Sequence, residues 1–365
     1  MVARGAAAAD RVEQGQLLAA WPDEAQAQQG LAFLKAQYGL DPTATASFAN
    51  VGVTIALFQL PRHQEAIRLK EELTRTQPGW TVDFNGLLYT MAEPRHYALA
   101  QIGHSPSAAG RAVGARIGLL DTDIEEIPAL DDVRITIQDF VGAQDGPDSR
   151  AHGTAIASLL VGLDEKHGFR PVARGAELMA AAIVMRRNGR GVTNVGLVMS
   201  GLDWLLGQQV QVINISLGGP DNAVMAMAIE AIARRSVLIV AAAGNDGPKG
   251  QPLYPAAYAN VIAATAVDAR ERVFQRASRG PHVMIAAPGV DLWVPDAAQG
   301  RYVSGTSFAA AHVTGALALL RVAEPRARPA ELKERLCGTA KNLGEPGRDP
   351  VFGCGLLQVA RALRL

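Results

Sequence analysis

The sequence predicts an α/β protein in which a small α+β domain precedes a doubly wound, mostly parallel β-sheet. From residue 116 onward, short apolar runs of strand length alternate with apolar helical stretches, which is typical of a parallel sheet covered by helices on both faces. The first 91 residues differ, because amphipathic segments replace most of these continuous apolar runs. The 365 residues leave room for two or three domains. We therefore predict domains at residues 1–91 and 92–365.

In the small domain, helices and strands are expected to alternate. Asp23 and Glu24 are typical of a helix start, and Asn50 and Gly52 mark a turn between two strands. In chain order we expect a strand at 16–21, a helix at 24–38, strands at 43–51 and 53–60, a helix at 61–75 and a strand at 80–91. The order β-α-β-β-α-β is the split βαβ, or ferredoxin-like, arrangement.

The large domain is expected to supply the reactive groups. Its predicted strands are 116–120, 177–185, 210–215, 237–243, 261–267 and 283–287, and its predicted helices are 152–161, 194–206, 223–235 and 308–323. A parallel sheet of this kind places its functional side chains at the carboxyl ends of the strands. Reactive side chains are therefore expected at those ends.

Composition excludes several classes of protein. Apolar residues make up 48% of the chain, which excludes disorder as its main state. The 35 basic and 35 acidic side chains balance, which argues against nucleic acid or an anionic membrane as a partner. No run reaches the roughly 18 apolar residues of a membrane span, and residues 1–10 lack the apolar core of an intact signal peptide.

Three reactive side chains fall at a strand end or at helix starts: Asp121, His152 and Ser307. A serine hydroxyl becomes a nucleophile when a neighbouring base takes its proton, and the pKa of histidine suits that task. A buried carboxylate fixes the imidazole tautomer and stabilises the imidazolium. Taken singly, each is more often a turn, cap or structural residue. Together, in the order Asp, His, Ser, they favour a catalytic triad.

A fourth residue, Asn245, follows Gly244 at the end of another apolar strand. Attack on a carbonyl creates an oxyanion, which needs hydrogen-bond donors already in place. The amide of Asn245 and the backbone N–H of Ser307, at a helix start, are two candidate donors.

The motifs around these residues resemble those of the subtilisin-like serine peptidases, the subtilases. The matching blocks are His152-Gly153-Thr154, the strand from Ile213 to Pro220, Ala243-Gly244-Asn245 and Gly305-Thr306-Ser307. The resemblance covers nearly the whole chain and implies a subtilisin-like fold with endopeptidase activity on extended polypeptides. It also implies that the first 91 residues are an inhibitor-like propeptide.

The resemblance further implies how substrate binds. Substrate is expected to add as a strand between Ser216-Leu217-Gly218 and Gly189-Arg190-Gly191, because backbone pairing gives affinity with little demand on sequence. The small residues Ala243 and Gly244 are expected to border the pocket for the primary side chain.

The segment after residue 91 is similar in layout to a mature subtilase N-terminus. We therefore expect a self-processing zymogen that cuts between Met91 and Ala92, with the propeptide acting as an intramolecular inhibitor. The expected location is secreted or periplasmic, and the expected state is a monomer.

Asp123 departs from the family pattern, which usually has glycine two residues after the acid, and Phe308 follows Ser307 where methionine is common. Asp123 belongs to an acidic cluster at 121–132 that suits calcium, although a solvated acidic loop is the simpler interpretation. The chemistry is expected to need no cofactor, structural calcium remains open, and no metal ligand is assigned.

Two cysteines are too few for a disulfide-dense scaffold or a four-cysteine zinc site. In an oxidising compartment a bridge between Cys337 and Cys354 contributes about 3 kcal/mol, and two buried free thiols are the alternative.

Two other functions compete with a general endopeptidase. One is a catalytically silent subtilase-fold binding protein, in which Asp123 disturbs the site or the propeptide never leaves. The other is a maturation peptidase that is dedicated to one partner substrate. Covalent labelling of Ser307 separates the first alternative from an active enzyme, and a cleavage profile separates the second.

Overall fold

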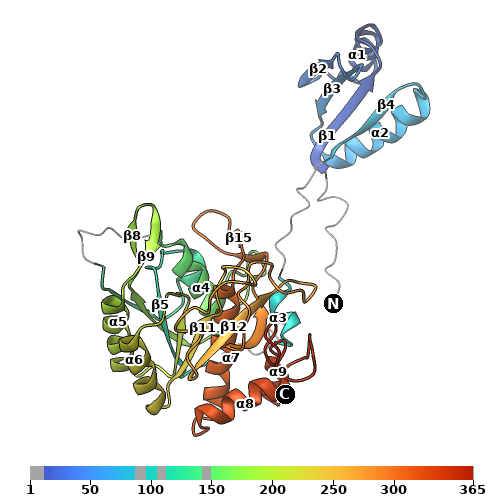
Figure 1. Cartoon of the computed structure of the whole chain (residues 1–365). Coiled ribbons are helices and arrows are strands. Elements are labelled where there is room, and N and C mark those ends of the chain that lie inside the picture. Colours follow the sequence, from blue (N-terminus) through green and yellow to red (C-terminus); the bar gives the residue numbers. More distant parts are fainter. Residues whose placement is uncertain (1–11, 87–95, 105–111, 142–148, 365) are drawn as a thin grey trace. The chain divides into compact units, whose positions relative to one another are not determined.

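The computed structural model describes residues 12–86, 96–104, 112–141 and 149–364. The chain forms two compact units, Met1–Glu93 and Pro94–Leu365 (Figure 1). The predicted junction of Met91 and Ala92 lies outside the described residues.

The N-terminal unit has the predicted order of elements. They are β1 (Val12–Trp21), α1 (Glu24–Tyr38), β2 (Ala44–Phe48), β3 (Val53–Gln59), α2 (His63–Thr76) and β4 (Thr81–Gly86). The strands form an antiparallel sheet in the order β2-β3-β1-β4. The prediction of a small α+β domain is confirmed.

One face of this sheet carries the core of the unit. Leu17, Trp21 and Phe58 are buried together with residues from both helices. Side chains alternate between the two faces of a strand, so Leu18 and Leu57 point to the opposite face, where they are only half-buried. The unit therefore has an apolar sheet face that its own helices leave partly open.

The larger unit contains a seven-stranded parallel sheet in the order β13-β12-β11-β10-β5-β7-β6 (Figure 1). Its strands are β5 (Arg116–Asp121), β6 (Ile135–Asp139), β7 (Glu177–Ala182), β10 (Val212–Ile215), β11 (Leu238–Ala242), β12 (Val261–Val267) and β13 (Val283–Pro288). Two hairpins stand outside it: β8–β9 (Met185–Arg187, Arg190–Val192) and β14–β15 (Leu292–Val294, Arg301–Val303). The predicted parallel sheet is confirmed.

Helices cover both faces of the sheet. Leu238 and Val240 of β11 belong to the core beneath α4 (Ala151–Val161) and α7 (Thr306–Ala323), whereas Ile239 between them belongs to the core beneath α5 (Val195–Gly207) and α6 (Ala223–Arg234). Neighbouring residues thus enter different cores, which explains why these strands are continuously apolar. The remaining helices are α3 (Ala98–Gln101), a 3-10 turn (Pro128–Leu130), α8 (Pro329–Thr339) and α9 (Val359–Ala362).

Helix α7 passes through the middle of the larger unit. Of the described helices, it alone is long and apolar enough to cross a membrane by length and composition, yet 89% of it is buried inside the protein. It is the central core helix of the unit.

Among the elements that the sequence did not predict, β6 and α8 have clear physical reasons. Edge strand β6 is mostly exposed and so lacks an apolar run. Helix α8 buries only Leu332 and Leu336, which gives a weak pattern.

The C-terminal segment is tied to the rest of the unit. Cys337 and Cys354 form a disulfide with a Cα–Cα distance of 5.1 Å. Farther along, the Val359 N–H donates to the Ile102 carbonyl at 2.7 Å, and the Gln358 side-chain amide donates to the Gln101 carbonyl at 3.2 Å. The end of the chain therefore lies against the first helix of its unit.

Candidate active site

The predicted site residues gather at the carboxyl edge of the parallel sheet. Asp121 ends β5, Ser216 follows the adjacent strand β10, and Asn245 follows β11, the next strand along. Strand β5 pairs with β7 on one edge and with β10 on the other. The strands that follow β5 in the chain are therefore added first on one side of it and then on the other. This is the topological switch point at which such sheets bind their ligands.

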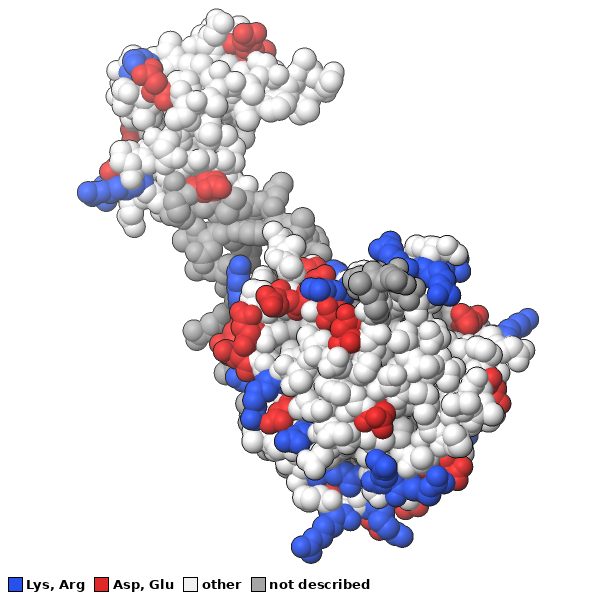
Figure 2. All heavy atoms as spheres, turned by 90° about the vertical axis from the view of Figure 1, so that its left-hand side faces the viewer, with Lys and Arg blue, Asp and Glu red and all other residues white. Residues whose placement is uncertain are grey.

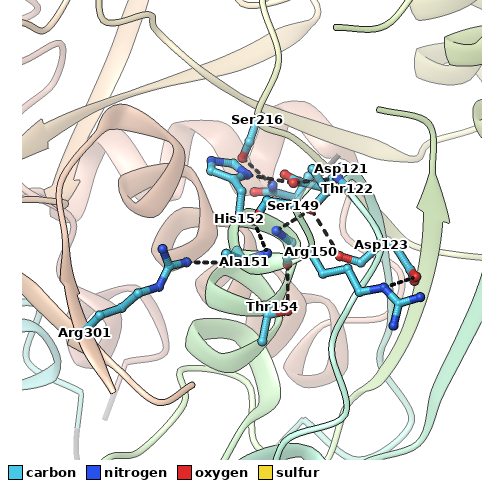
Figure 3. A network of polar contacts seen from close by, with 12 residues as sticks. Asp121, Thr122, Asp123, Ser149, Arg150, Ala151, His152, Thr154, Ser216 and Arg301 are labelled. Carbon is cyan, nitrogen blue, oxygen red and sulfur yellow. Dashed lines mark hydrogen bonds and ion pairs between the residues drawn. The ribbon is translucent and has the colours of Figure 1, made fainter. Parts of the chain in front are cut away.

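Asp121 contacts His152 directly. Asp121 Oδ1 lies 2.7 Å from His152 Nδ1 and also accepts the Thr122 N–H at 2.8 Å (Figure 3). The Asp121 side chain is 1% exposed and that of His152 is 39% exposed. The carboxylate is therefore buried behind an imidazole whose outer side reaches the surface, an arrangement that can hold one tautomer of the ring.

Close backbone packing holds the two residues together. The Gly153 N–H donates to Thr122 Oγ1 at 2.9 Å. A Cβ atom on Gly153 would lie 2.5 Å from the Thr122 carbonyl oxygen, so only glycine fits there without movement of the backbone. The Glu125 N–H also donates to Thr154 Oγ1 at 2.9 Å.

Ser307 is the second residue of α7 and is 6% exposed. The first N–H groups of a helix have no partner within the helix. The Thr306 N–H donates to Asn245 Oδ1 at 3.1 Å, whereas no hydrogen bond of the described residues uses the Ser307 N–H. The ring of Phe308 lies 5.7 Å from that of His152, so the start of α7 packs against the imidazole.

The orientation of the Asn245 amide follows from Thr306. Asn245 Oδ1 accepts from both the N–H and the Oγ1 of Thr306, each at 3.1 Å. The amide nitrogen therefore points away from Thr306, toward Gly305, where a Cβ atom would lie 3.5 Å from Asn245 Nδ2. Its two N–H groups and the Ser307 N–H can serve as donors to an oxyanion.

The residues after β10 and β11 are placed by further contacts. Gly219 pairs with Tyr254 through two backbone hydrogen bonds of 2.9 Å, which anchors the end of the segment Ser216-Leu217-Gly218. Ala243 is buried, and the N–H of Gly244 donates to Thr306 Oγ1 at 3.2 Å. Gly244 has a φ of +113°, which favours glycine.

The second predicted edge is the hairpin β8–β9. Gly189 lies in its tight turn with a φ of +75°, following Asn188 at +52°. Arg190 and Gly191 belong to β9, which pairs with β8. Within the described residues β9 has no partner on its other edge, so Arg190 and Gly191, rather than Gly189, are placed to pair with an added strand.

An apolar cavity of about 170 Å³ connects the two edges. Thr193 and Asn194, just after β9, line it together with Leu217 and Gly218, and Met225 of α6 is also part of its wall. The face of the molecule that carries α5, α6 and the β8–β9 hairpin has a broad uncharged area (Figure 2). Both features suit a substrate that is held by its backbone and by apolar side chains.

The structure also shows supporting residues that the sequence analysis missed. Buried Asn214 donates to Ser216 Oγ at 3.0 Å and accepts from Thr314 Oγ1 of α7 at 2.9 Å. Arg301 of β15 donates to the Ala151 carbonyl (Figure 3). A polar residue within an apolar run, such as Asn214, was the available signal.

His312, five residues after Ser307 in α7, is a buried structural histidine. It is 1% exposed and its Nδ1 lies 2.8 Å from the Phe308 carbonyl oxygen. Burial lowers the pKa of His312 to about 4. His104 is also buried and lines one cavity with His312.

No group of three or more His, Cys, Asp or Glu side chains suited to a metal occurs within the ranges that the structure describes. In the loop at 162–171, Asp164 pairs with His167 at 2.7 Å and Glu165 with Arg170 at 3.2 Å.

Comparison with known proteins identifies the family. Residues 112–355 match the model of the Subtilase family. The chain belongs to the subtilases. It is 34% identical over 254 residues to the thermostable alkaline protease of Halalkalibacterium halodurans. This alignment covers 68% of this chain and 67% of that protein. It is 32% identical over 271 residues to subtilisin Savinase of Lederbergia lenta, covering 71% and 96%.

A likeness in fold to one solved structure covers nearly the whole chain, the N-terminal unit included. Fervidolysin from Fervidobacterium pennivorans, described as a keratinolytic enzyme related to subtilisin, aligns with a TM-score of 0.65 at 23% identity, covering 97% of this chain and 61% of that one. The chain is thus a subtilisin-like serine protease, and polypeptides are its substrates.

Proposed function

We propose that this subtilase is an endopeptidase whose catalytic residues are Asp121, His152 and Ser307. The observation that carries the proposal is the 2.7 Å contact between the buried Asp121 carboxylate and His152 Nδ1, on the same sheet edge as Asn245 and the start of α7.

The mechanism follows from this geometry. His152 Nε2 takes the proton of the Ser307 hydroxyl as its oxygen attacks the scissile carbonyl carbon, and Asp121 stabilises the imidazolium through Nδ1. Asn245 Nδ2 and the Ser307 N–H donate to the oxyanion. The imidazolium then protonates the leaving amine, which leaves an acyl group on Ser307. Water, activated by His152, releases the acid in the reverse sequence.

Substrate is proposed to lie extended between Ser216-Leu217-Gly218 and Arg190-Gly191. The adjoining cavity is supported as a binding site for an apolar side chain by Leu217 and Met225 in its wall. We expect a peptide library to be cut best with an apolar residue there. Met225→Lys should remove that preference while leaving cleavage of short substrates that do not reach the cavity.

The N-terminal unit is proposed to be a propeptide that inhibits the peptidase unit until it is cut off between Met91 and Ala92. Its partly open apolar sheet face, which includes Leu18 and Leu57, supports a role in binding another surface. N-terminal sequencing of the wild-type protein and of Ser307→Ala tests self-cleavage. Identical processing of both proteins would exclude it.

The disulfide between Cys337 and Cys354 supports a secreted or periplasmic location, where an oxidising environment preserves such bonds. Every catalytic group in the proposed steps comes from the protein, so we expect brief treatment with a chelator to leave kcat unchanged, whether or not the protein holds structural calcium. We further propose that the enzyme acts as a monomer.

The decisive test is covalent labelling of the processed protein with a fluorophosphonate. We expect one label on Ser307, loss of peptide hydrolysis on labelling, and neither in Ser307→Ala. A processed, folded protein that takes no label would instead be a binding protein. Cleavage of one sequence only in a peptide library would indicate a dedicated maturation peptidase.

A further inference from the structure

Asp123, the acid that departs from the family pattern, has a specific partner. Its Oδ2 lies 2.8 Å from Arg150 Nε, and its Oδ1 accepts the Ile124 N–H at 2.8 Å. Arg150 reaches Asp123 from the start of α4 (Figure 3). The side chain of Asp123 is 21% exposed and that of Arg150 is 52% exposed.

This ion pair joins the two segments that carry the proposed acid and base. Asp123 is two residues after Asp121, and Arg150 is two residues before His152. The carbonyl of Arg150 also accepts from Thr154 Oγ1 at 2.7 Å, and Thr154 Oγ1 accepts the Glu125 N–H. The ion pair thus lies beside neutral contacts that already hold the segments together.

Asp123 and Arg150 contribute opposite charges close to the Asp121–His152 pair. Figure 3 shows charged side chains near His152 from three elements: Asp121 and Asp123 from the β5 end, Arg150 at the start of α4 and Arg301 from β15. The start of α7 and the residue after β10 contribute only the uncharged Ser307, Phe308 and Ser216. Asp121 Oδ2 is buried and has no hydrogen-bond partner among described residues, so nearby charges act on a poorly solvated carboxylate.

We propose that Arg150 is a positioning residue that cancels the charge of Asp123 beside the Asp121–His152 pair, and thereby sets the pH at which His152 takes up a proton. Asp123 alone favours the imidazolium, and Arg150 alone disfavours it. For charges several ångströms apart at a partly exposed site, each effect is on the order of half a pH unit. The consequence for catalysis rests on the proposed function, but the effect on titration does not.

The test is an NMR titration of the full-length Ser307→Ala protein with 13C-labelled histidine, in which the His152 signal is assigned by its loss in His152→Gln. Arg150→Gln is expected to move the His152 midpoint to higher pH. Asp123→Asn is expected to move it to lower pH, and the double variant should lie near the parent. Arg150→Lys keeps the charge and should shift it little.

Arg234→Gln, which breaks the surface pair of Arg234 with Glu230, is the matched control and should not move the midpoint. Raising the salt concentration should shrink both shifts. Shifts of the same sign in Arg150→Gln and Asp123→Asn, or no shift in either, would overturn the proposal, because loosening of the structure has no reason to depend on the sign of the removed charge.

A second measurement separates this proposal from the proposed function. In the active enzyme, the acidic limb of kcat/KM against pH should move with the NMR midpoint in Arg150→Gln. If the midpoint moves and the limb does not, the charge balance stands and the role of His152 as base is wrong.

Discussion

Helices α4 and α7 both present a proposed catalytic residue at their second position, but they hold it by different means. The first turn of α7 is buried and fixed by neutral contacts, with Asn245 Oδ1 accepting from Thr306 and the Gly305 N–H donating to the Gly289 carbonyl at 2.8 Å. The first turn of α4 is half-exposed and is additionally fixed by charges. The nucleophile is thus set mainly by packing, whereas the base is also set by interactions that salt and pH can change.

The largest expected effect is that of Gly153→Ala, which breaks the close packing behind the base. The added Cβ would lie 2.5 Å from the Thr122 carbonyl oxygen and 2.8 Å from that of Asp123, so the backbone must move. We expect kcat/KM to fall by about 10²-fold or more, because small displacements of reacting groups are costly. Gly338→Ala in α8, where a Cβ meets nothing within 4 Å, is the control. An active Gly153→Ala would show that the base tolerates movement.

The second largest effect is expected at the buried start of α7. Asn245→Ala removes a proposed oxyanion donor, and kcat should fall by about 10²- to 10³-fold with KM little changed, the range known for removal of such an asparagine from a subtilisin. Steady-state kinetics with a peptide substrate measure both constants. A loss confined to KM would contradict the assignment.

Thr306→Val separates the donor from its support. The change removes the Oγ1 contacts with Asn245 and Gly244 but leaves the Thr306 N–H on Asn245 Oδ1. The expected loss in kcat is about fivefold, since one neutral hydrogen bond contributes about 1 kcal/mol. A loss as large as that of Asn245→Ala would mean that the orientation of the amide depends on the threonine hydroxyl.

The last predicted effect lies inside α7 and concerns stability rather than rate. Burial lowers the pKa of His312 to about 4 from 6.5, so below pH 6.5 the unfolded chain binds the proton that the folded protein excludes. Stability is therefore lost as the pH falls from 6.5 toward 4, by about 2 kcal/mol at pH 5. Urea unfolding of Ser307→Ala with and without His312→Gln should show a shallower pH dependence when histidine is absent. Equal slopes would contradict this.

Buried elements and catalytic motifs could be predicted from the sequence, whereas exposed elements and ion pairs could not. Continuous apolar runs locate strands buried on both faces, and β12 was predicted with the bounds Val261–Val267 that the structure shows. The edge strand β6 has no such run. The motifs predicted that Asp121 and His152 lie together. The partner of Asp123 was not predictable, because an ion pair between a loop and a helix start leaves no periodic pattern.

For the hairpin β8–β9, the sequence predicted the location of the substrate edge but not which of its residues lie on the strand. The motif Gly189-Arg190-Gly191 was predicted as one edge, but the positive φ angles of Asn188 and Gly189 make a two-residue turn there. An Asn-Gly pair is a hairpin signal in itself, and it fixes which residues remain on the strand.

The contact between Val359 and Ile102 means that the larger unit begins and ends at nearly the same place. A unit whose two ends lie close together can be circularly permuted. A short linker could join the present ends, and new ends could be opened at a turn such as Asn188-Gly189. In such a circular permutant the residues now at the C-terminus would precede the segment that follows residue 95. The order of the three residues along the chain would change from Asp, His, Ser to Ser, Asp, His, while the sheet edge that gathers them would stay the same.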